Sequence, residues 1–245
     1  MELEECRMTR PLRLQIENAF YHVMNRSIDK IKICSGSSDH ERFVDRLAEI
    51  SSRFDVRILS YCLMSNHYHL LFQTPLTNLS RVMKHLGQVF TRRSNQRLSR
   101  DGPLFRGRFK SILIGEEEYL MQVIRYIHLN PVEARIVKSA EEYRWSSYLP
   151  ILNGVENQYW LRRDLVLRLF GVDRQRASVN YLEFHARGNR KDLSKFYRRK
   201  SLPCILGSDE YIWSMESGDL KNSLAPSVPD PNMALRCRMG GVEVR

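Results

Sequence analysis

The pattern of apolar and polar residues along the first 130 positions switches repeatedly between the period of a strand and the period of a helix. Short runs rich in β-branched and aromatic residues, each ending in turn-forming residues, predict strands. Apolar residues spaced i, i+3, i+4, i+7 behind a capping or acidic residue predict helices. The predicted strands are residues 20–24, 56–63, 67–72 and 109–114, and the predicted helices are residues 39–50, 79–98 and 116–130.

This order of elements, β-α-β-β-α-β-α, predicts an α+β protein with a ferredoxin-like antiparallel sheet and helices packed on one face. The other face of the sheet is expected to be open to a ligand. The last of these helices should stop at Asn130, because the proline that follows disfavours helical geometry in the residue before it.

From about residue 150 the periodicity weakens and the chain becomes more basic. Residues 160–170 and 178–185 predict two further helices, and residues 187–200 carry seven basic residues and one acidic residue. We therefore predict a catalytic domain over residues 1–150, a helical basic extension over residues 151–220 and a disordered tail over residues 221–245.

Two histidines stand one residue apart at the start of a predicted strand. Because strand side chains alternate between faces, His67 and His69 project together, and Tyr68 projects to the opposite face. Two imidazoles on one rigid strand make half of a divalent-metal site. For this pair alone, a structural role is the stronger interpretation.

The last helix of the domain offers a second pair of polar residues on one face. Tyr126 and Asn130 are four residues apart and lie outside the apolar stripe of that helix. Tyr126 has the alternative of an amphipathic residue at the rim of the core, and Tyr119 is a rival on the same face. Asn130 has the alternative of an N-cap for a following helix that begins at Pro131.

Taken together, the two pairs predict a chemistry. His67, His69 and the amide oxygen of Asn130 are ligands that suit Mg²⁺ or Mn²⁺ and leave positions open for a phosphate. The hydroxyl of Tyr126, one helical turn before Asn130, is then placed to attack phosphorus. The resulting phosphotyrosine conserves the bond energy, so that a DNA strand can be rejoined rather than hydrolysed.

The charge of the chain favours a polyanionic partner. The 245 residues carry 39 Lys and Arg against 28 Asp and Glu, a net charge of +11, and such an excess is typical of nucleic-acid-binding proteins. A solvated helix face is the alternative for the densest basic stretch. The residues expected to contact DNA are Arg92, Arg93, Arg97, Arg100, Phe105, Arg106, Arg108 and Lys110.

Other features of the sequence exclude some classes of protein. No apolar run approaches the roughly 20 residues that span a membrane. The five cysteines are scattered without a CxxC pair, which argues against a disulfide framework or a zinc ribbon. We expect a cytoplasmic, nucleoid-associated protein. His22, His85 and His128 are interpreted as structural.

Several of these motifs, in this order and spacing, resemble the single-tyrosine transposases of the HUH superfamily, especially the branch associated with repetitive extragenic palindromes (REP). The motifs are Tyr61–His69, Gly107–Lys110, Arg125–Val132 and Trp145–Tyr148. The resemblance covers about residues 10–150. Residues 28–38 depart from the family pattern, so no DNA contact is assigned to them.

The resemblance implies a specific activity and specific roles. It implies cleavage of single-stranded DNA beside a hairpin, with Mg²⁺ or Mn²⁺ on His67, His69 and Asn130 and with Tyr126 as the nucleophile that forms a 5′-phosphotyrosine. It leaves open whether the site forms within one chain or across a homodimer. The alternatives are a DNA- or RNA-hairpin binder or repressor on the same fold and, ranked last, a metal hydrolase, since no carboxylate stands in the histidine strand.

Overall fold

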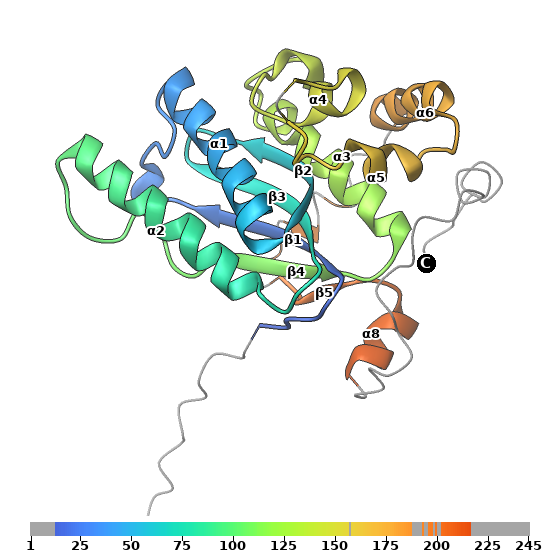
Figure 1. Cartoon of the computed structure of the whole chain (residues 1–245), viewed down its shortest axis with the longest axis horizontal. Helices are drawn as coiled ribbons and strands as arrows, with labels where there is room; N and C mark the ends of the chain where they lie inside the picture. Colours follow the sequence, from blue (N-terminus) through green and yellow to red (C-terminus); the bar gives the residue numbers. More distant parts are fainter. Residues whose placement is uncertain are drawn as a thin grey trace, which may run out of the picture.

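The computed structural model describes residues 13–156, 158–187, 193, 196–197, 199 and 202–216. Its strands and helices are coloured along the chain in Figure 1. The strands are β1 (Ala19–Arg26), β2 (Arg57–Leu63), β3 (His67–Thr74), β4 (Lys110–Ile114) and β5 (Ile205–Leu206). The α-helices are α1 (Ser37–Phe54), α2 (Leu79–Leu98), α3 (Glu117–Glu133), α4 (Tyr148–Asn153), α5 (Arg163–Arg168), α6 (Arg174–Arg187) and α8 (Asp209–Glu216). Two 3₁₀ turns, Ile28–Lys30 and Ala140–Glu142, complete the elements.

The strands form one sheet in the order β2-β3-β1-β4-β5. The first four pair antiparallel, with β1 between β3 and β4, which is the ferredoxin-like order. The predicted α+β class is therefore confirmed. The fifth strand was not predicted: β5 pairs parallel to β4 over two residues, too short a run for an alternating pattern to show in the sequence.

Helices α1 and α2 cover one face of the sheet because both are amphipathic. Phe43 of α1 lies 5.2 Å from the ring of Tyr68 in β3 and 4.2 Å from the ring of Phe90 in α2. Together with Leu47 and Ile50, Phe43 is fully buried. Tyr68 thus points to α1, as the alternation of the histidine strand predicts.

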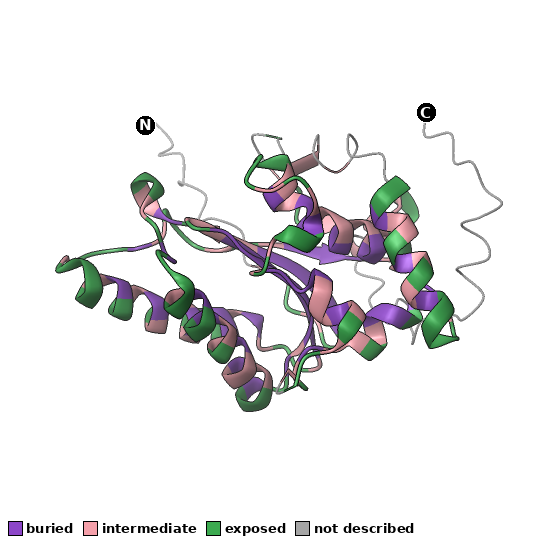
Figure 2. Ribbon diagram, turned by 90° about the horizontal axis from the view of Figure 1, so that it is seen from above, coloured by how far each residue is buried: buried purple, intermediate pink, exposed green. Residues whose placement is uncertain are grey.

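The prediction that helices occupy one face only, with the other face open, is wrong. Helix α3 packs on β2 and β3, and Figure 2 shows helices on both sides of the buried sheet. The physical reason is the composition of α3, which buries Leu120, Val123, Ile124 and Ile127 as an apolar stripe and needs an apolar surface to cover it. The histidine face of the sheet is consequently a cleft beside a helix.

Helix α3 also continues past the predicted stop at Asn130. Pro131 lies inside the helix and is buried, and the backbone N–H of Ala134 donates to the carbonyl of Asn130 at 2.9 Å. A proline disfavours helical geometry in the preceding residue without forbidding it. Here the helix gains one further turn that packs Pro131 and ends before Arg135, whose φ of 57° is left-handed.

The described part of the C-terminal extension is packed against the domain by a buried polar network. Nε2 of His128 in α3 lies 3.0 Å from Oγ of Ser60 and 2.8 Å from Oγ of Ser147. Nδ1 of His128 lies 3.0 Å from the hydroxyl of Tyr181 and 3.1 Å from Nε2 of His185, both on α6. Because buried polar groups are costly unless paired, this network fixes α6 against α3 and β2.

The extension differs from its predicted helices in extent. The predicted helix at 160–170 is reduced to α5, whereas the predicted helix at 178–185 is lengthened to α6. Most of the basic stretch 187–200 and the predicted disordered tail at 221–245 lie outside the described residues. None of the helices in the described ranges is long and apolar enough to cross a bilayer.

The buried histidines predict that the protein loses stability in mild acid. Burial lowers the pKa of His22 to about 3 and that of His185 to about 4, whereas a histidine in the unfolded chain titrates near about 6.5. Between pH 6.5 and 4 the unfolded chain therefore binds more protons, and stability falls as the pH falls.

We expect a decrease on the order of several kcal/mol across this window, measured from urea unfolding at a series of pH values. His185→Gln should flatten the dependence, whereas His85→Gln, at a residue outside the buried network, should not. Parallel curves for His185→Gln and the wild type would contradict this account.

Truncation tests the predicted division at residue 150. A chain that ends there loses Ile151, Val166 and Tyr181, which are fully buried, and uncovers the surface of α3 and β2 that they cover. We expect its melting temperature to fall well below that of residues 1–216. Equal melting temperatures would show that residues 1–150 form an independent domain.

Candidate active site

The register of the sheet brings six side chains to the histidine face. Residues directly opposite each other in an antiparallel pair project to the same side. In β1, Met24 lies opposite His69 and Arg26 lies opposite His67, while Lys110 of β4 lies opposite Met24. His22 is two residues before Met24 and so shares the same face.

A tight hairpin orients the first histidine. Met64, Ser65 and Asn66 connect β2 to β3, and the N–H of Met64 closes the turn by donating to the carbonyl of His67 at 2.9 Å. Nδ1 of His67 lies 2.7 Å from Oδ1 of Asn66. Because that oxygen accepts only, Nδ1 carries the proton and Nε2 keeps its lone pair.

Helix α3 brings the tyrosine and the asparagine to the histidines of the same chain. The ring of Tyr126 stands edge-on to the ring of His69, with centroids 5.5 Å apart. The side chain of Asn130 hydrogen-bonds to His67. Tyr119 is not among the described residues that line the cleft containing Tyr126. Burial and the nearby charges of Glu116, Glu118 and Asp209 raise the pKa of Tyr119.

These side chains line a cleft of about 460 Å³. Among the described residues that line it, four are basic and none is Asp or Glu. Its lining residues are Met24, Asn25, Arg26, His67, His69, Arg106, Gly107, Arg108, Lys110, Tyr126, Asn130, Tyr197 and Leu202. The basic residues of this lining attract an anion.

Both candidate ligand histidines are neutral at neutral pH. Burial, then the charge of Arg26, lowers the pKa of His67 to about 4, and the hydrogen bond to Asn130 acts in the opposite direction. Burial, then the neighbouring His22, His67 and Arg26, holds the pKa of His69 well below its usual value. A metal ion binds the neutral imidazole, so this environment favours coordination over protonation.

The donor set fits a hard divalent ion with weak intrinsic affinity. Two imidazole nitrogens and one amide oxygen suit Mg²⁺ or Mn²⁺ and leave positions for phosphate oxygens. No group of three His, Cys, Asp or Glu side chains suited to a metal occurs within the described ranges. A set without a carboxylate leaves the ion's charge to be balanced by a bound phosphate, so His67, His69 and Asn130 would hold the metal best together with DNA.

His22, for which the sequence predicts a structural role, contacts the candidate site directly. Its Nε2 lies 3.0 Å from Nδ1 of His69, and its Nδ1 lies 2.5 Å from the hydroxyl of Tyr197. The ring of Tyr197 also stacks on the ring of Tyr126, with centroids 4.0 Å apart. Arg26 and Tyr197 were likewise missed. Their signal in the sequence is weak, because it depends on strand register and on a residue far along the chain.

The contacts of His22 are compatible with the tautomer that metal binding requires. For Nε2 of His69 to hold an ion, its Nδ1 must carry the proton and donate it to Nε2 of His22. His22 then carries its own proton on Nδ1 and donates to the oxygen of Tyr197. One chain of donors, from His69 through His22 to Tyr197, thus fixes the ring that would bind the metal.

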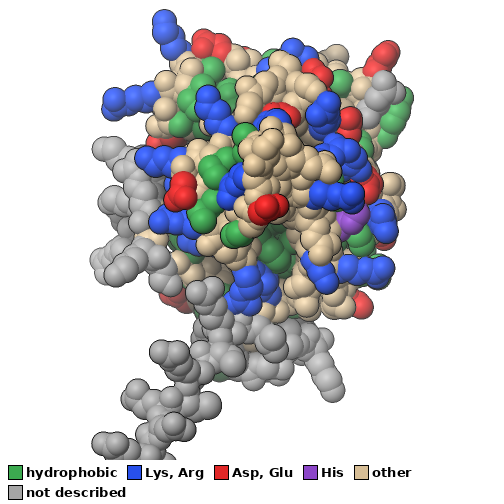
Figure 3. Space-filling model, turned by 90° about the vertical axis from the view of Figure 1, so that its left-hand side faces the viewer, with side chains coloured by type: hydrophobic (Ala, Val, Ile, Leu, Met, Phe, Trp, Pro, Cys, Tyr) green, Lys and Arg blue, Asp and Glu red, His purple; other side chains and the backbone are tan. Residues whose placement is uncertain are grey.

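The eight residues expected to contact DNA do not form one surface. Arg106, Arg108 and Lys110 line the cleft. Arg92 and Phe105 line a neighbouring groove beside α2, which shares Asn25, Gly107 and Arg108 with the cleft. The two hollows together make a continuous basic track. Figure 3 shows Lys and Arg side chains spread over the side of the molecule that lies at the left in Figure 1, with Asp and Glu side chains among them.

The remaining residues of the set lie elsewhere. Arg93 and Arg97 face α1, in a separate groove on the other side of α2. Arg100 donates to the carbonyl of Pro103 at 3.3 Å and so supports the loop. Phe105 packs its ring edge-on against Tyr68, with centroids 5.9 Å apart, so only part of it is available to a base.

Comparisons with known proteins agree with this fold. The family model described as "Transposase IS200 like" matches residues 15–130. The structure of a REP-associated tyrosine transposase bound to a REP hairpin aligns with a TM-score of 0.51 at 14% identity, covering 58% of this chain and 84% of that one.

A second solved structure, described as a transposase from Deinococcus radiodurans, aligns with a TM-score of 0.35 at 17% identity, covering 49% of this chain and 95% of that one. A comparison with curated proteins gives no match.

Residues 15–130 match the IS200-like transposase family model, and the fold is similar to that of a REP-associated tyrosine transposase. The resemblance found in the motifs is thereby confirmed.

The contacts of His22 predict its effect on metal binding. His22→Phe keeps an aromatic ring but removes the acceptor for His69, and loss of such a partner typically weakens metal affinity about 10- to 100-fold. Titration of Mn²⁺ followed by electron paramagnetic resonance measures this directly. His85→Phe, at a histidine remote from the cleft, is the matched control. Equal Mn²⁺ affinity of His22→Phe and the wild type would show that His22 does not orient His69.

Proposed function

We propose that this protein is a transposase that works as a metal-dependent endonuclease and strand transferase on single-stranded DNA beside a hairpin. It nicks and rejoins the strand through Tyr126. One observation carries the proposal: within a single chain, Tyr126 contacts His69 and Asn130 bonds to His67, in a cleft whose described lining residues include four basic residues. The family match of residues 15–130 supports the same activity.

In this proposal each residue of the cleft has a distinct role. His67, His69 and Asn130 would hold Mg²⁺ or Mn²⁺, which supplies Lewis acidity to the phosphoryl oxygens. Arg26 and Lys110 are placed to neutralise the phosphate, since both share the histidine face of the sheet.

The chemical step is a transfer of the phosphoryl group to the tyrosine. The phenolic oxygen of Tyr126 forms a bond to phosphorus, and the bond from phosphorus to the 3′ oxygen breaks. The proton of the tyrosine leaves to solvent, and the departing 3′ oxygen takes up a proton. A 5′-phosphotyrosine and a free 3′-OH result. Attack of a 3′-OH on the same phosphorus reverses the step and joins a strand.

The path of the DNA follows the basic track. The scissile phosphate lies in the cleft, and the strand continues past Arg108 into the groove lined by Arg92 and Phe105. The fold shared with a transposase described as bound to a REP hairpin supports a hairpin as the partner. A chromosomal DNA substrate also implies association with the nucleoid. Because one chain provides all four site residues, catalysis needs no partner subunit, and a homodimer would serve another step.

A second function, a DNA- or RNA-hairpin binder or repressor on the same fold, is favoured by one contact. Tyr197 stacks on Tyr126 and lines the cleft, so one face of the nucleophile is covered. In that case the cleft would recognise nucleic acid without cutting it.

Replacement of the nucleophile separates the two functions. We expect the wild type, incubated with a labelled library of single-stranded hairpins and Mn²⁺, to form a covalent protein–DNA band that EDTA abolishes. Tyr126→Phe should lose the band entirely, because it lacks the attacking oxygen but keeps the ring. Tyr119→Phe, seven residues earlier on α3, should keep it.

Two outcomes contradict the proposal. A wild type that binds hairpins tightly but forms no adduct favours the binding protein. An adduct that persists in Tyr126→Phe assigns the nucleophile to another residue.

A further inference from the structure

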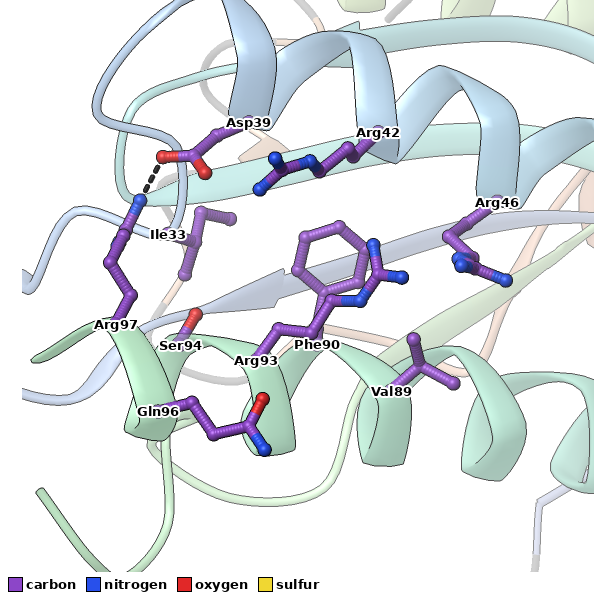
Figure 4. A pocket seen from close by; sticks show the side chains of 10 residues that line it. All are labelled: Ile33, Asp39, Arg42, Arg46, Val89, Phe90, Arg93, Ser94, Gln96 and Arg97. Atoms are coloured by element: carbon purple, nitrogen blue, oxygen red, sulfur yellow. Dashed lines mark hydrogen bonds and ion pairs between the residues drawn. The ribbon is translucent and has the colours of Figure 1, made fainter. Parts of the chain in front are cut away.

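A second basic groove lies between α1 and α2, away from the cleft. It measures about 550 Å³, and its arginines come from both helices: Arg42 and Arg46 from α1, Arg93 and Arg97 from α2. Figure 4 shows these side chains from opposite walls of the groove. Because α1 and α2 cover the sheet face to which Tyr68 points, and the histidines point to the other, the sheet separates this groove from the reaction site.

The four arginines are not equally neutralised. Arg97 is paired with Asp39 and Arg46 with Glu49. Arg42 and Arg93 form no ion pair with any described residue, and in Figure 4 they reach into the space between the helices. Nε of Arg46 is buried and lacks a hydrogen-bond partner. The groove therefore offers two guanidinium groups to an anion.

The helices bring like charges close together. Arg42 and Arg46 are four residues apart on α1, as are Arg93 and Arg97 on α2, and like charges at this spacing repel one another, which the ion pairs of Arg46 and Arg97 offset in part. The two helices then place both pairs on facing walls of one groove. A bound phosphate would offset this repulsion, and arginine binds phosphate with two parallel hydrogen bonds.

The floor of the groove indicates which form of nucleic acid it suits. Ile33 and Phe90 form an apolar floor, and both are buried. Binding of single strands uses exposed aromatic faces on which bases stack, and Phe90 is only 8% exposed. A site with guanidinium groups and no exposed aromatic ring in its lining suits the backbone of a duplex, which is contacted through phosphates.

We propose that this groove is a second DNA site, which binds the phosphate backbone of the hairpin's duplex stem through Arg42 and Arg93. The inference rests on the proposed function for the presence of a hairpin. Neighbouring residues of α2 line different grooves. Arg92 lines the track to the cleft, whereas Arg93, about 100° further round the helix, lines the second groove. The stem would thus be held on the sheet face opposite the strand that reacts.

Charge reversal in the groove tests the assignment. The variant Arg42→Glu/Arg93→Glu is compared with Arg168→Glu/Arg176→Glu, which makes the same change in net charge at exposed residues of α5 and α6. Binding of a duplex-stem DNA hairpin is measured over a series of salt concentrations, with a short single strand carrying only the cleavage site as the second ligand. Urea unfolding checks that every variant is folded, and Arg42→Lys/Arg93→Lys preserves the charge.

We expect Arg42→Glu/Arg93→Glu to bind the hairpin at least about tenfold more weakly at low salt, with a salt slope shallower by about 2, one unit for each lost phosphate contact. Affinity for the short strand, and any adduct on it, should stay at the wild-type level. The control should match the wild type, and the lysine variant should retain most of the slope.

Three results would overturn the inference. Hairpin binding could remain unchanged relative to the control. Affinity for the short strand could fall as much as affinity for the hairpin, which would place the arginines on the reacting strand. An RNA hairpin could bind more tightly through the same arginines, which would assign the groove to RNA. Because binding is measured without cleavage, absence of the Tyr126 adduct would refute the proposed function and leave this test intact.

Discussion

The antiparallel pairing of β1 with β3 is the constraint on which the rest of the candidate site depends. It places Arg26 opposite His67 and Met24 opposite His69, and the two-residue alternation adds His22 to the same face. A register shift of one residue would send these side chains to the opposite face, among the packed rings of Phe43 and Phe90. The arrangement of the cleft residues therefore depends on the register of the backbone hydrogen bonds between β1 and β3. Buried residues on both faces of the sheet stabilise that register.

Helix α3 supplies the second half of the site and shows why the two halves meet. Its apolar stripe must cover the sheet, and this packing turns Tyr126 and Asn130 towards the histidines. The imidazoles of His67 and His69 are buried enough from solvent to stay neutral. The basic side chains around them attract a phosphate. His128 is also buried from solvent, and its hydrogen bonds hold α6 of the extension against the domain.

The sequence predicts those parts of the site that are local in the chain. His67 and His69 are adjacent on a strand, and Tyr126 and Asn130 are one turn apart on a helix, so period alone places each pair. His22 and Tyr197 escape such reasoning, because their contacts join β1 to β3 and the extension to α3 over long sequence separations. The covered sheet face and the turn of helix after Pro131 were missed for a related reason. In both places, tertiary packing overrides the conformation that the local sequence favours.

The positions of the basic residues also depend on the fold. Residues 92–110 look like one basic stretch in the sequence, yet the geometry of α2 sends Arg92 and Arg93 to separate grooves, and the following loop returns Arg106 and Arg108 to the cleft. Composition indicates a polyanionic partner, while only the fold indicates how many sites on the protein can bind that partner. In this account, the protein binds the hairpin DNA at two sites and cleaves it at one of them, the cleft.

The most direct test of the central claim is a crystal structure of Tyr126→Phe with Mn²⁺ and a hairpin that carries its cleavage site, with the metal located by anomalous scattering. The account predicts one strong peak bound by His67, His69 and Asn130, with the scissile phosphate beside it and residue 126 facing that phosphorus. A peak that avoids these three ligands, or a phosphate beyond the reach of residue 126, would contradict it.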